Sequence, residues 1–256
     1  MDENSTYKEI SERSFGEVKE QQFGYAVLPW GALEPHNYHL PYATDVLLSQ
    51  KLSIAAAEKV GKEYNIVGGV LPPVWLGSQN PGQWNQPFCI HARYETQKAI
   101  LADVVVSLYR QQIKRLIIVN GHGGNAFKNM VRDLAFDYPD FIISVTDWYS
   151  TVPQESYFEN GGGHADEMET SLLLHYYPQY VDMSRAGSGA YTPFAAQSLN
   201  EKTGWLPRNW SKVSDDTGVG NPYKASAEKG ERYAAAVIEK LSQLFVEIAK
   251  GEIYRR

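Results

Sequence analysis

Short apolar runs alternate with amphipathic helical segments along most of this chain, and that alternation restricts its fold more than any other feature. Strand-like runs occur at residues 25–28, 66–75, 116–119 and 141–145, and helical patterns at residues 46–60, 96–112 and 226–250. Strands that alternate with helices form βαβ units, whose parallel strands are covered by helices on both faces. The sequence therefore predicts an α/β fold with a mostly parallel sheet, and we expect one domain over residues 1–256.

Two long stretches, residues 77–94 and 185–223, have no regular pattern, and the second contains Trp205 and Trp210. Loops of this length within a compact domain usually serve as lids or subunit contacts. Since ligands in open parallel sheets gather at the carboxyl ends of the strands, we expect such loops to border a binding site or an interface.

The composition excludes several kinds of partner and site. The net charge is -6 and no basic cluster is longer than Lys114-Arg115, so we expect no nucleic-acid partner. The single cysteine, Cys89, allows neither an internal disulfide nor a thiolate metal cluster. No apolar run reaches the roughly 18–20 residues of a membrane span, and residues 1–20 lack the apolar core of a secretory signal. We therefore expect a cytoplasmic protein that does not associate with membranes.

The segment at residues 28–45 is dense with side chains that can bind a metal ion. Glu34 and His36 are two residues apart, and Pro35 favours an extended backbone for the residue before it. An extended backbone directs both side chains to the same side. Asp45 follows, just before an apolar helical run. A carboxylate and an imidazole directed together in this way suit adjacent metal ions.

Two further segments each add a candidate ligand. His122 follows the strand at residues 116–119 within the glycine-rich sequence of residues 120–125, where a ligand has room to approach. A phosphate-binding loop fits less well, because the spacing matches no nucleotide motif and no lysine follows. Glu169 shares the apolar face of a predicted helix with Leu172 and Leu173, where a carboxylate is rarely buried unless it is paired or binds a cation.

Each of these residues alone has a structural explanation, and we interpret His91 and His175 as structural histidines. The combination of two histidines and three carboxylates, each at the end of a strand or helix, favours a metal site instead. Hard oxygen and imidazole ligands suit Zn, Mn or Fe(II), and a site for two metals needs a carboxylate that bridges them. The residue pattern alone leaves the choice between a metal hydrolase and a structural site open.

At these residues the chain resembles the creatininase (creatinine amidohydrolase) family. The family's motifs are matched in order at residues 29–45, 120–125, 164–171 and 217–231. The resemblance implies a creatininase-like, three-layer α/β/α sandwich with a mostly parallel sheet. It also implies a homo-oligomer, commonly a homohexamer.

The resemblance further implies a role for each residue of the site. The implied ligands of the two divalent metal ions are Glu34 and His122 for one ion, His36 and Glu169 for the other, and Asp45 as the bridge. His164 would be a catalytic histidine beside the metals, and His39 would support the site.

The chain also departs from the family pattern. Creatininase itself carries a metal-binding glutamate two residues after the histidine of the second motif, where this chain has Gly124. Other family members share this glycine, and in those the glutamate of the third motif becomes the ligand, which here is Glu169. Asn37 replaces a usual glycine, and the segment 82–91 differs from many members, so the substrate pocket is expected to differ as well.

The expected activity is hydrolysis of a non-peptide C–N bond, in a small amide, lactam or formamide, by a hydroxide held on two divalent ions (Zn, Mn or Fe). His164 would protonate the leaving nitrogen or stabilise the tetrahedral intermediate. Similarity of fold does not choose among substrates, so a metal-dependent peptidase of the mycofactocin-maturation type remains an alternative. A metal-stabilised binding protein without turnover is a second alternative, and a structural α/β protein, which predicts no stoichiometric metal, is a third.

Overall fold

The computed structural model describes residues 8–254, which contain one parallel five-stranded sheet in the order β1-β3-β2-β4-β5. The prediction of an α/β fold with a mostly parallel sheet is confirmed. Residues 1–7, on which part of the expectation about a secretory signal rests, lie outside the described residues. The strands are β1 (Lys8–Glu9), β2 (Tyr25–Trp30), β3 (Gly68–Val70), β4 (Arg115–Asn120) and β5 (Ile142–Asp147).

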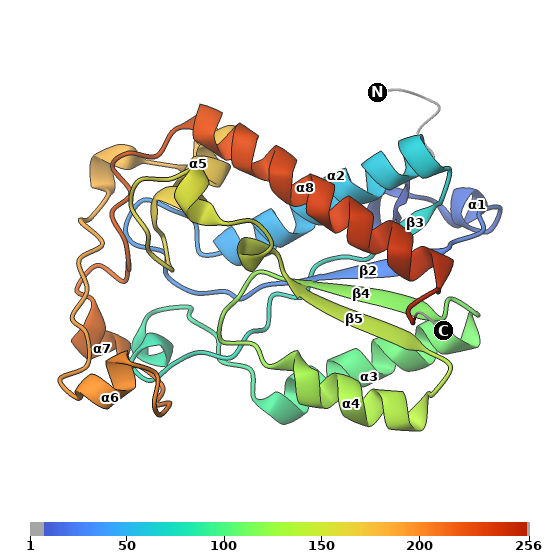
Figure 1. Cartoon of the computed structure of the whole chain (residues 1–256), viewed down its shortest axis with the longest axis horizontal. Coiled ribbons are helices and arrows are strands. Elements are labelled where there is room, and N and C mark those ends of the chain that lie inside the picture. Colours follow the sequence, from blue (N-terminus) through green and yellow to red (C-terminus); the bar gives the residue numbers. More distant parts are fainter. Residues whose placement is uncertain (1–7, 255–256) are drawn as a thin grey trace.

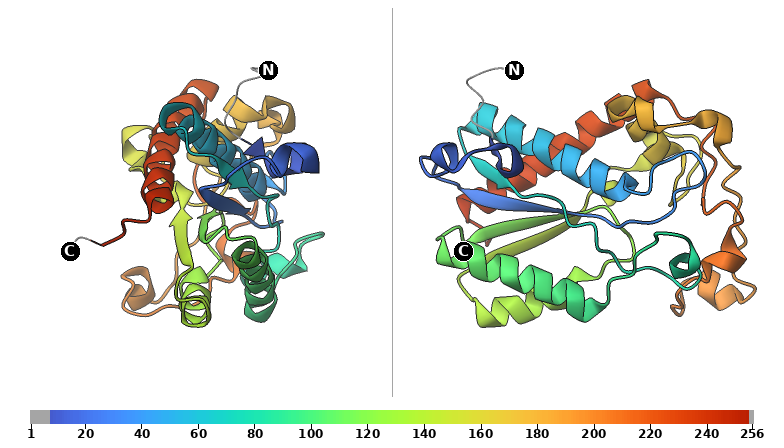
Figure 2. Two further views of the ribbon diagram at one scale, coloured as in Figure 1. Left: turned by 90° about the vertical axis from the view of Figure 1, so that its right-hand side faces the viewer. Right: turned by 180° about the vertical axis from the view of Figure 1, so that it is seen from behind.

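Helices cover both faces of the sheet and complete three layers (Figure 1, with two further views in Figure 2). One face carries α2 (Thr44–Tyr64), α5 (Glu167–Tyr176) and α8 (Ala227–Lys250), and the other carries α3 (Tyr94–Arg110) and α4 (Phe127–Asp137). The connections contain the four-residue helices α1 (Phe15–Val18), α6 (Gln197–Asn200) and α7 (Trp210–Val213). They also contain the 3-10 turns η1 (Ile10–Glu12), η2 (Gln83–Asn85), η3 (Trp148–Ser150), η4 (Gln154–Ser156), η5 (Pro178–Tyr180) and η6 (Met183–Arg185).

The alternation of side chains along β4 divides the hydrophobic core into two layers. Leu116 and Ile118 join the cluster formed with α3 and α4, whereas Ile117 and Val119 join the cluster formed with α2, α5 and α8. Every one of these four side chains is fully buried. A strand buried on both faces carries a continuous apolar run, which is why residues 116–119 of β4 include no polar side chain.

Two details differ from the sequence-based expectations. The helix α4 was not expected, because its first turn has no capping side chain to mark its start, although Phe127, Met130 and Leu134 form a buried stripe. The strand β2 continues through Pro29, where an end was expected. Proline lacks only the amide hydrogen, and the Pro29 carbonyl accepts a hydrogen bond from the Val74 amide at 3.0 Å.

The helix α8 is amphipathic and begins at the predicted cap, where the Ser226 side chain accepts a hydrogen bond from the Lys229 amide. Its buried face includes Tyr233, Val237 and Leu241.

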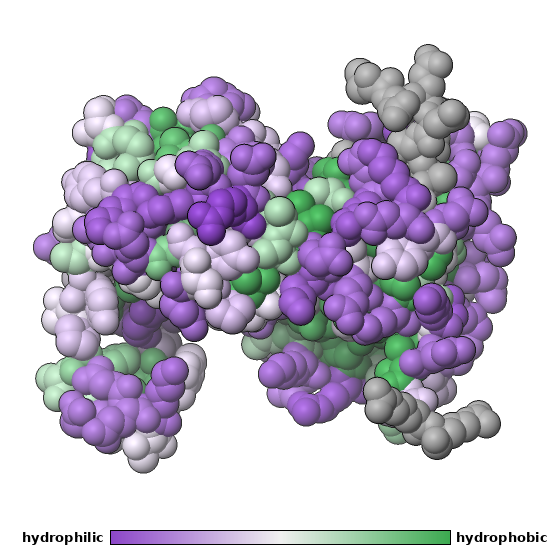
Figure 3. Space-filling model, turned by 45° about the horizontal axis from the view of Figure 1, so that its top comes forward, coloured by the Kyte–Doolittle hydropathy of each residue, from purple (hydrophilic) through white to green (hydrophobic). Residues whose placement is uncertain are grey.

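Hydrophilic side chains dominate the molecular face seen in Figure 3. Within residues 8–254, no helix combines the length and the apolar character needed to cross a bilayer.

The close approach of α8 to α5 depends on Gly230. A Cβ atom at this position would lie 2.1 Å from the carbonyl oxygen of Ser171, which belongs to the backbone of α5. We therefore expect Gly230→Ala to force the helices apart and to lower the free energy of unfolding by about 2–3 kcal/mol, measured by urea denaturation. The control Glu231→Ala, on the exposed side of α8, should change it by less than about 0.5 kcal/mol. An unchanged unfolding midpoint for Gly230→Ala would contradict this packing argument.

Candidate metal centre

The five candidate ligands lie together beyond the carboxyl ends of β2 and β4. Glu34 and His36 follow β2, His122 follows β4, and Asp45 and Glu169 lie in the first turns of α2 and α5. All five side chains are at least nine-tenths buried. The structure thus brings together every candidate ligand that the sequence analysis singled out, from segments as far apart in the chain as Glu34 and Glu169.

The first group of ligand atoms belongs to Glu34, Asp45 and His122. His122 Nδ1 lies 3.0 Å from Glu34 Oε1 and 3.1 Å from Asp45 Oδ2. The other ring nitrogen, Nε2, lies 2.7 Å from the carbonyl oxygen of Ser78. A carbonyl only accepts hydrogen bonds, so Nε2 carries a hydrogen and Nδ1 is the nitrogen presented to the carboxylates. A histidine held in this way by a backbone carbonyl is typical of metal sites.

The second group belongs to His36, Asp45 and Glu169. His36 Nε2 lies 3.0 Å from Asp45 Oδ1 and 4.0 Å from Glu169 Oε2. His36 Nδ1 donates a hydrogen bond to the carbonyl oxygen of Glu34 at 3.0 Å, which again leaves one nitrogen for the site. Asp45 therefore contributes one carboxylate oxygen to each group.

The start of α5 fixes the position of Glu169. The Asp166 side chain caps this helix and accepts hydrogen bonds from the amides of Met168 and Glu169. Glu169 Oε2 accepts a hydrogen bond from the Ala165 amide at 2.6 Å, so the carboxylate is held close to its own backbone. His39 donates to or accepts from the Thr170 hydroxyl at 2.9 Å and does not reach the ligand atoms.

His164 lies beside the cluster and presents one free nitrogen to it. Its Nε2 donates to the carbonyl oxygen of Pro35 at 2.8 Å, and its Nδ1 lies 3.7 Å from Glu34 Oε1. His164 also belongs to a third group of potential ligand atoms with Glu34 and His36, which the sequence analysis did not consider. Backbone pairing with Val219, from the fourth motif, fixes this segment.

The electrostatics of the cluster reflect several charges buried in a small space. Burial raises the pKa of Glu169 to about 8. Burial alone would lower the pKa of His36, but the carboxylates of Asp45 and Glu169 outweigh it and raise that pKa to about 10. Burial and the nearby charge of His36 lower the pKa of His164 to about 4. In the protein without metal, bound protons therefore balance the negative charge of the buried carboxylates. Bound cations would take over this role.

The donor set fits divalent cations. Asp45 Oδ2 is buried and has no hydrogen-bond partner among the described residues, despite its proximity to His122. In each of the three groups the ligand atoms lie within 4.8 Å of one another. Carboxylate oxygens and imidazole nitrogens at such distances suit Zn, Mn or Fe(II).

The lack of space around Gly124 explains why this chain has no glutamate at that position, where creatininase carries one. A Cβ atom here would lie 2.1 Å from the Ser78 carbonyl oxygen and 2.5 Å from His122 Nε2. The hydrogen bond that orients His122 therefore occupies the space that a side chain at 124 would need. The backbone of this chain cannot accommodate a glutamate there, and the third carboxylate of the cluster is that of Glu169.

Sequence reasoning missed several residues that support the cluster. Gln83 Nε2 donates to Glu34 Oε2 at 2.5 Å from within the stretch 77–94, for which no pattern was found. Asn120 donates to the carbonyl oxygen of His122, and Asn125 accepts from the Ser78 amide. The two asparagines flank the glycines of the second motif, a signal that could have identified them.

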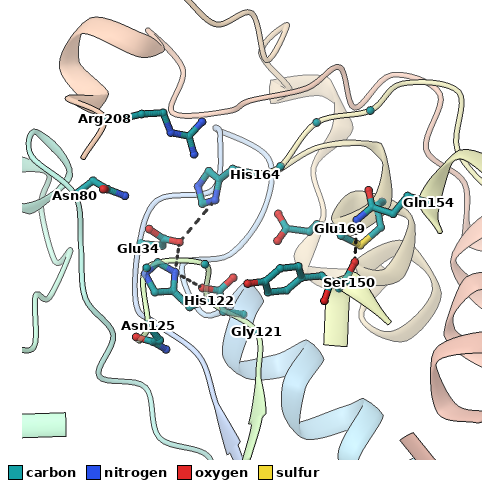
Figure 4. A pocket seen from close by; sticks show the side chains of 18 of the residues that line it. Glu34, Asn80, Gly121, His122, Asn125, Ser150, Gln154, His164, Glu169 and Arg208 are labelled. Carbon is teal, nitrogen blue, oxygen red and sulfur yellow. Dashed lines mark hydrogen bonds and ion pairs between the residues drawn. The ribbon is translucent and has the colours of Figure 1, made fainter. Parts of the chain in front are cut away.

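A cavity of about 1140 Å³ opens above the cluster (Figure 4). Both unassigned stretches line it, the first through Ser78–Asn80 and Gln83 and the second through Phe194, residues 205–208 and Trp210. Aromatic side chains from the second stretch, Trp205 and Trp210, form part of its wall, and the Trp210 ring lies 4.9 Å from that of His164. The cluster is therefore reached through a chamber large enough for a small organic molecule.

Three relatives with known names match most of the chain. A 3-dehydro-scyllo-inosose hydrolase of Thermotoga maritima is 25% identical over 95% of this chain and 81% of its own length. A mycofactocin precursor peptide peptidase of Mycobacterium ulcerans is 29% identical over 83% and 81%. A creatinine amidohydrolase of Pseudomonas putida is 30% identical over 80% and 82%. All three are hydrolases, but their names give three different substrates.

Solved structures show the same fold. A putative creatinine amidohydrolase from Bacteroides fragilis superposes with a TM-score of 0.95 at 49% identity, covering 98% of this chain and all of that one. Creatininase structures described as a manganese form and, for a mutant, as a zinc–zinc form give TM-scores of 0.75 and 0.74 at 22% and 24% identity, over 95% of this chain and 98% of theirs. The family model for creatinine amidohydrolase matches residues 8–245. The chain is therefore a hydrolase of the creatininase (creatinine amidohydrolase) family.

Proposed function

We propose that this enzyme is an amidohydrolase with two divalent metal ions that cleaves a non-peptide C–N bond in a small amide, lactam or formamide. The observation that carries the proposal is Asp45, whose two oxygens face two separate groups of buried ligands. Glu34 and His122 would hold one cation and His36 and Glu169 the other. Zn and Mn are the ions named for the solved creatininases of the same fold, and Fe remains compatible with the donor set.

When bound, such cations polarise a carbonyl oxygen and acidify a water molecule so that it can act as a nucleophile near neutral pH. Neighbouring groups of the protein hold the proposed metal ligands in position. The carbonyls of Ser78 and Glu34 fix the two ligand histidines, and Gln83 fixes the Glu34 carboxylate through its side-chain amide. These contacts hold the ligands before the substrate arrives, which lowers the cost of reorganisation during the reaction.

His164 is the residue that we assign to proton transfer. Its Nε2 hydrogen is committed to the Pro35 carbonyl, whereas Nδ1 faces the cluster with a free lone pair. Nδ1 can hold the proton that the attacking water loses and pass it to the leaving nitrogen. The C–O bond then forms and the C–N bond breaks without a change in the total number of protons.

Removal of metal tests the proposal directly. Purified protein is expected to contain about two equivalents of Zn, Mn or Fe by mass spectrometry, and to hydrolyse at least one substrate from a panel of creatinine, N-formyl compounds and lactams. Chelation should abolish that activity, and the matching divalent ion should restore it, because metal ligation is what activates the water. A protein that binds two cations but hydrolyses nothing in the panel or among short peptides would favour a metal-stabilised binding protein. A protein without stoichiometric metal would overturn the proposal.

A peptidase is the second candidate function. One observation favours it, the volume of the cavity above the cluster, which exceeds what a single small ring requires. The named peptide peptidase among the relatives is nearly as similar to this chain as the creatinine amidohydrolase. Cleavage of short peptides with no hydrolysis of the small amides would select this function.

We also propose that this chain forms a homo-oligomer, specifically the homohexamer that the family resemblance implies. Several large apolar side chains of the segment 75–94 are exposed, namely Trp75, Trp84, Phe88 and Ile90, and burial between subunits would remove this surface from water. Light scattering coupled to size-exclusion chromatography measures the assembly, and a monomer at micromolar concentration would contradict it. A cytoplasmic location stays a prediction of the sequence.

A further inference from the structure

Arg208 is a cation without a carboxylate partner at the substrate cavity. Within the described part of the chain, it is the only lysine or arginine that lines the cavity. No hydrogen bond or ion pair links it to another described residue, and its contact is with an aromatic ring instead. Its guanidinium lies 5.2 Å from the centre of the Trp210 ring. Figure 4 shows this guanidinium directed from its loop toward His164.

The cation–π contact with Trp210 places the guanidinium beside a fixed ring. Trp210 is itself buried, with 6% of its surface exposed, and its ring meets that of His164 in a T-shaped arrangement. A cation–π contact uses the charge of the guanidinium and does not consume its N–H donors, which have no hydrogen-bond partner among the described residues. Those N–H groups match the two oxygens of a carboxylate in a bidentate hydrogen bond.

A second polar group in the cavity wall also lacks a partner. Gln79 is 95% buried (5% exposed), and neither its side-chain oxygen nor its nitrogen has a hydrogen-bond partner among the described residues. A buried amide without partners costs free energy, so a ligand that supplies both a donor and an acceptor would be bound favourably. The wall of the cavity therefore favours the binding of a substrate with polar groups over that of a purely apolar one.

We propose that Arg208 binds a carboxylate of the substrate, so that the enzyme acts on an amide that carries a negative charge. This proposal rests on the amidohydrolase function proposed above. A monoanion fits better than a phosphate dianion, because Arg208 is a single cation. The other charged residues of the wall outside the ligand cluster are acidic, namely Glu155 and Glu159.

The test compares two ligands of similar shape, levulinate and 2-hexanone, of which only the first carries a carboxylate. Neither has a C–N bond, so binding is measured by calorimetry on the metal-loaded enzyme without turnover. We expect Arg208→Gln to weaken levulinate binding about tenfold or more, the usual range for a charge-assisted hydrogen bond, and to leave 2-hexanone binding unchanged. Arg208→Lys should keep part of the affinity, because it retains the charge but not the bidentate geometry.

The matched control is Arg132→Gln, an exposed arginine on α4 that does not line the cavity. It should bind both ligands as the wild type does. Wild-type affinity of Arg208→Gln for levulinate would overturn the proposal, as would an equal loss of both ligands, which is the result expected if Arg208 only supports Trp210. A failure of the amidohydrolase function would appear separately, as the absence of turnover in the substrate panel, and would leave this binding result standing.

Discussion

Glu169→Gln is expected to lower kcat/KM by about 100- to 1000-fold, the range found when one electrostatic group is removed from an active site. The glutamine keeps the shape of the side chain and an oxygen that can accept the Ala165 hydrogen bond. It removes the carboxylate charge that would bind a cation held between this side chain and His36, whose Nε2 lies 4.0 Å from Glu169 Oε2. We therefore expect the bound metal to fall from two equivalents to about one, measured by mass spectrometry on the same sample.

The fold should survive this change. Burial raises the pKa of Glu169 to about 8, so the folded protein already holds this group uncharged at neutral pH when no cation is bound. The thermal midpoint of the metal-free variant should accordingly stay within a few degrees of that of the metal-free wild type. Glu231→Gln, an exposed substitution on α8, serves as the control. Two bound cations and near wild-type turnover in Glu169→Gln would refute the ligand assignment.

Gly124→Ala is expected to reduce activity by about 100-fold, because a displacement of roughly 1 Å at a catalytic group can have an effect of that size. The added Cβ atom would overlap the Ser78 carbonyl and His122 Nε2, so one of them has to move. Either movement breaks the hydrogen bond that directs His122 Nδ1 to Glu34 and Asp45. Kinetics on the best substrate of the panel, together with metal content, measure the loss.

The neighbouring glycine provides the comparison. A Cβ atom at Gly123 would meet only the Tyr149 hydroxyl, at an ordinary 3.7 Å. Gly123→Ala should therefore lose at least ten times less activity than Gly124→Ala, although both substitutions alter the same glycine pair. Equal losses would mean that the loop needs glycine for flexibility and that the contact with His122 is not the cause. The same clash predicts that Gly124→Glu cannot rescue Glu169→Gln.

Local patterns in the sequence predicted several elements of the fold. The apolar run at residues 116–119 became β4 because side chains that are apolar without alternation are stable only in a strand covered on both faces. The periodic helix that starts at Ser226 became α8 for a similarly local reason, a capping side chain followed by an amphipathic repeat. By contrast, α4 was missed where the capping signal is absent.

The sequence by itself determined the fold class and the set of candidate ligands, because strand and helix periods and ligand-bearing motifs are local properties of the chain. Only the tertiary structure decided which groups orient and surround those ligands. Gln83 reaches Glu34 across 49 residues, Ser78 reaches His122 across 44, and Arg208 approaches the cavity from a stretch without periodicity. Contacts of this kind depend on how distant loops pack against one another at the end of the sheet, and no spacing along the chain records that packing.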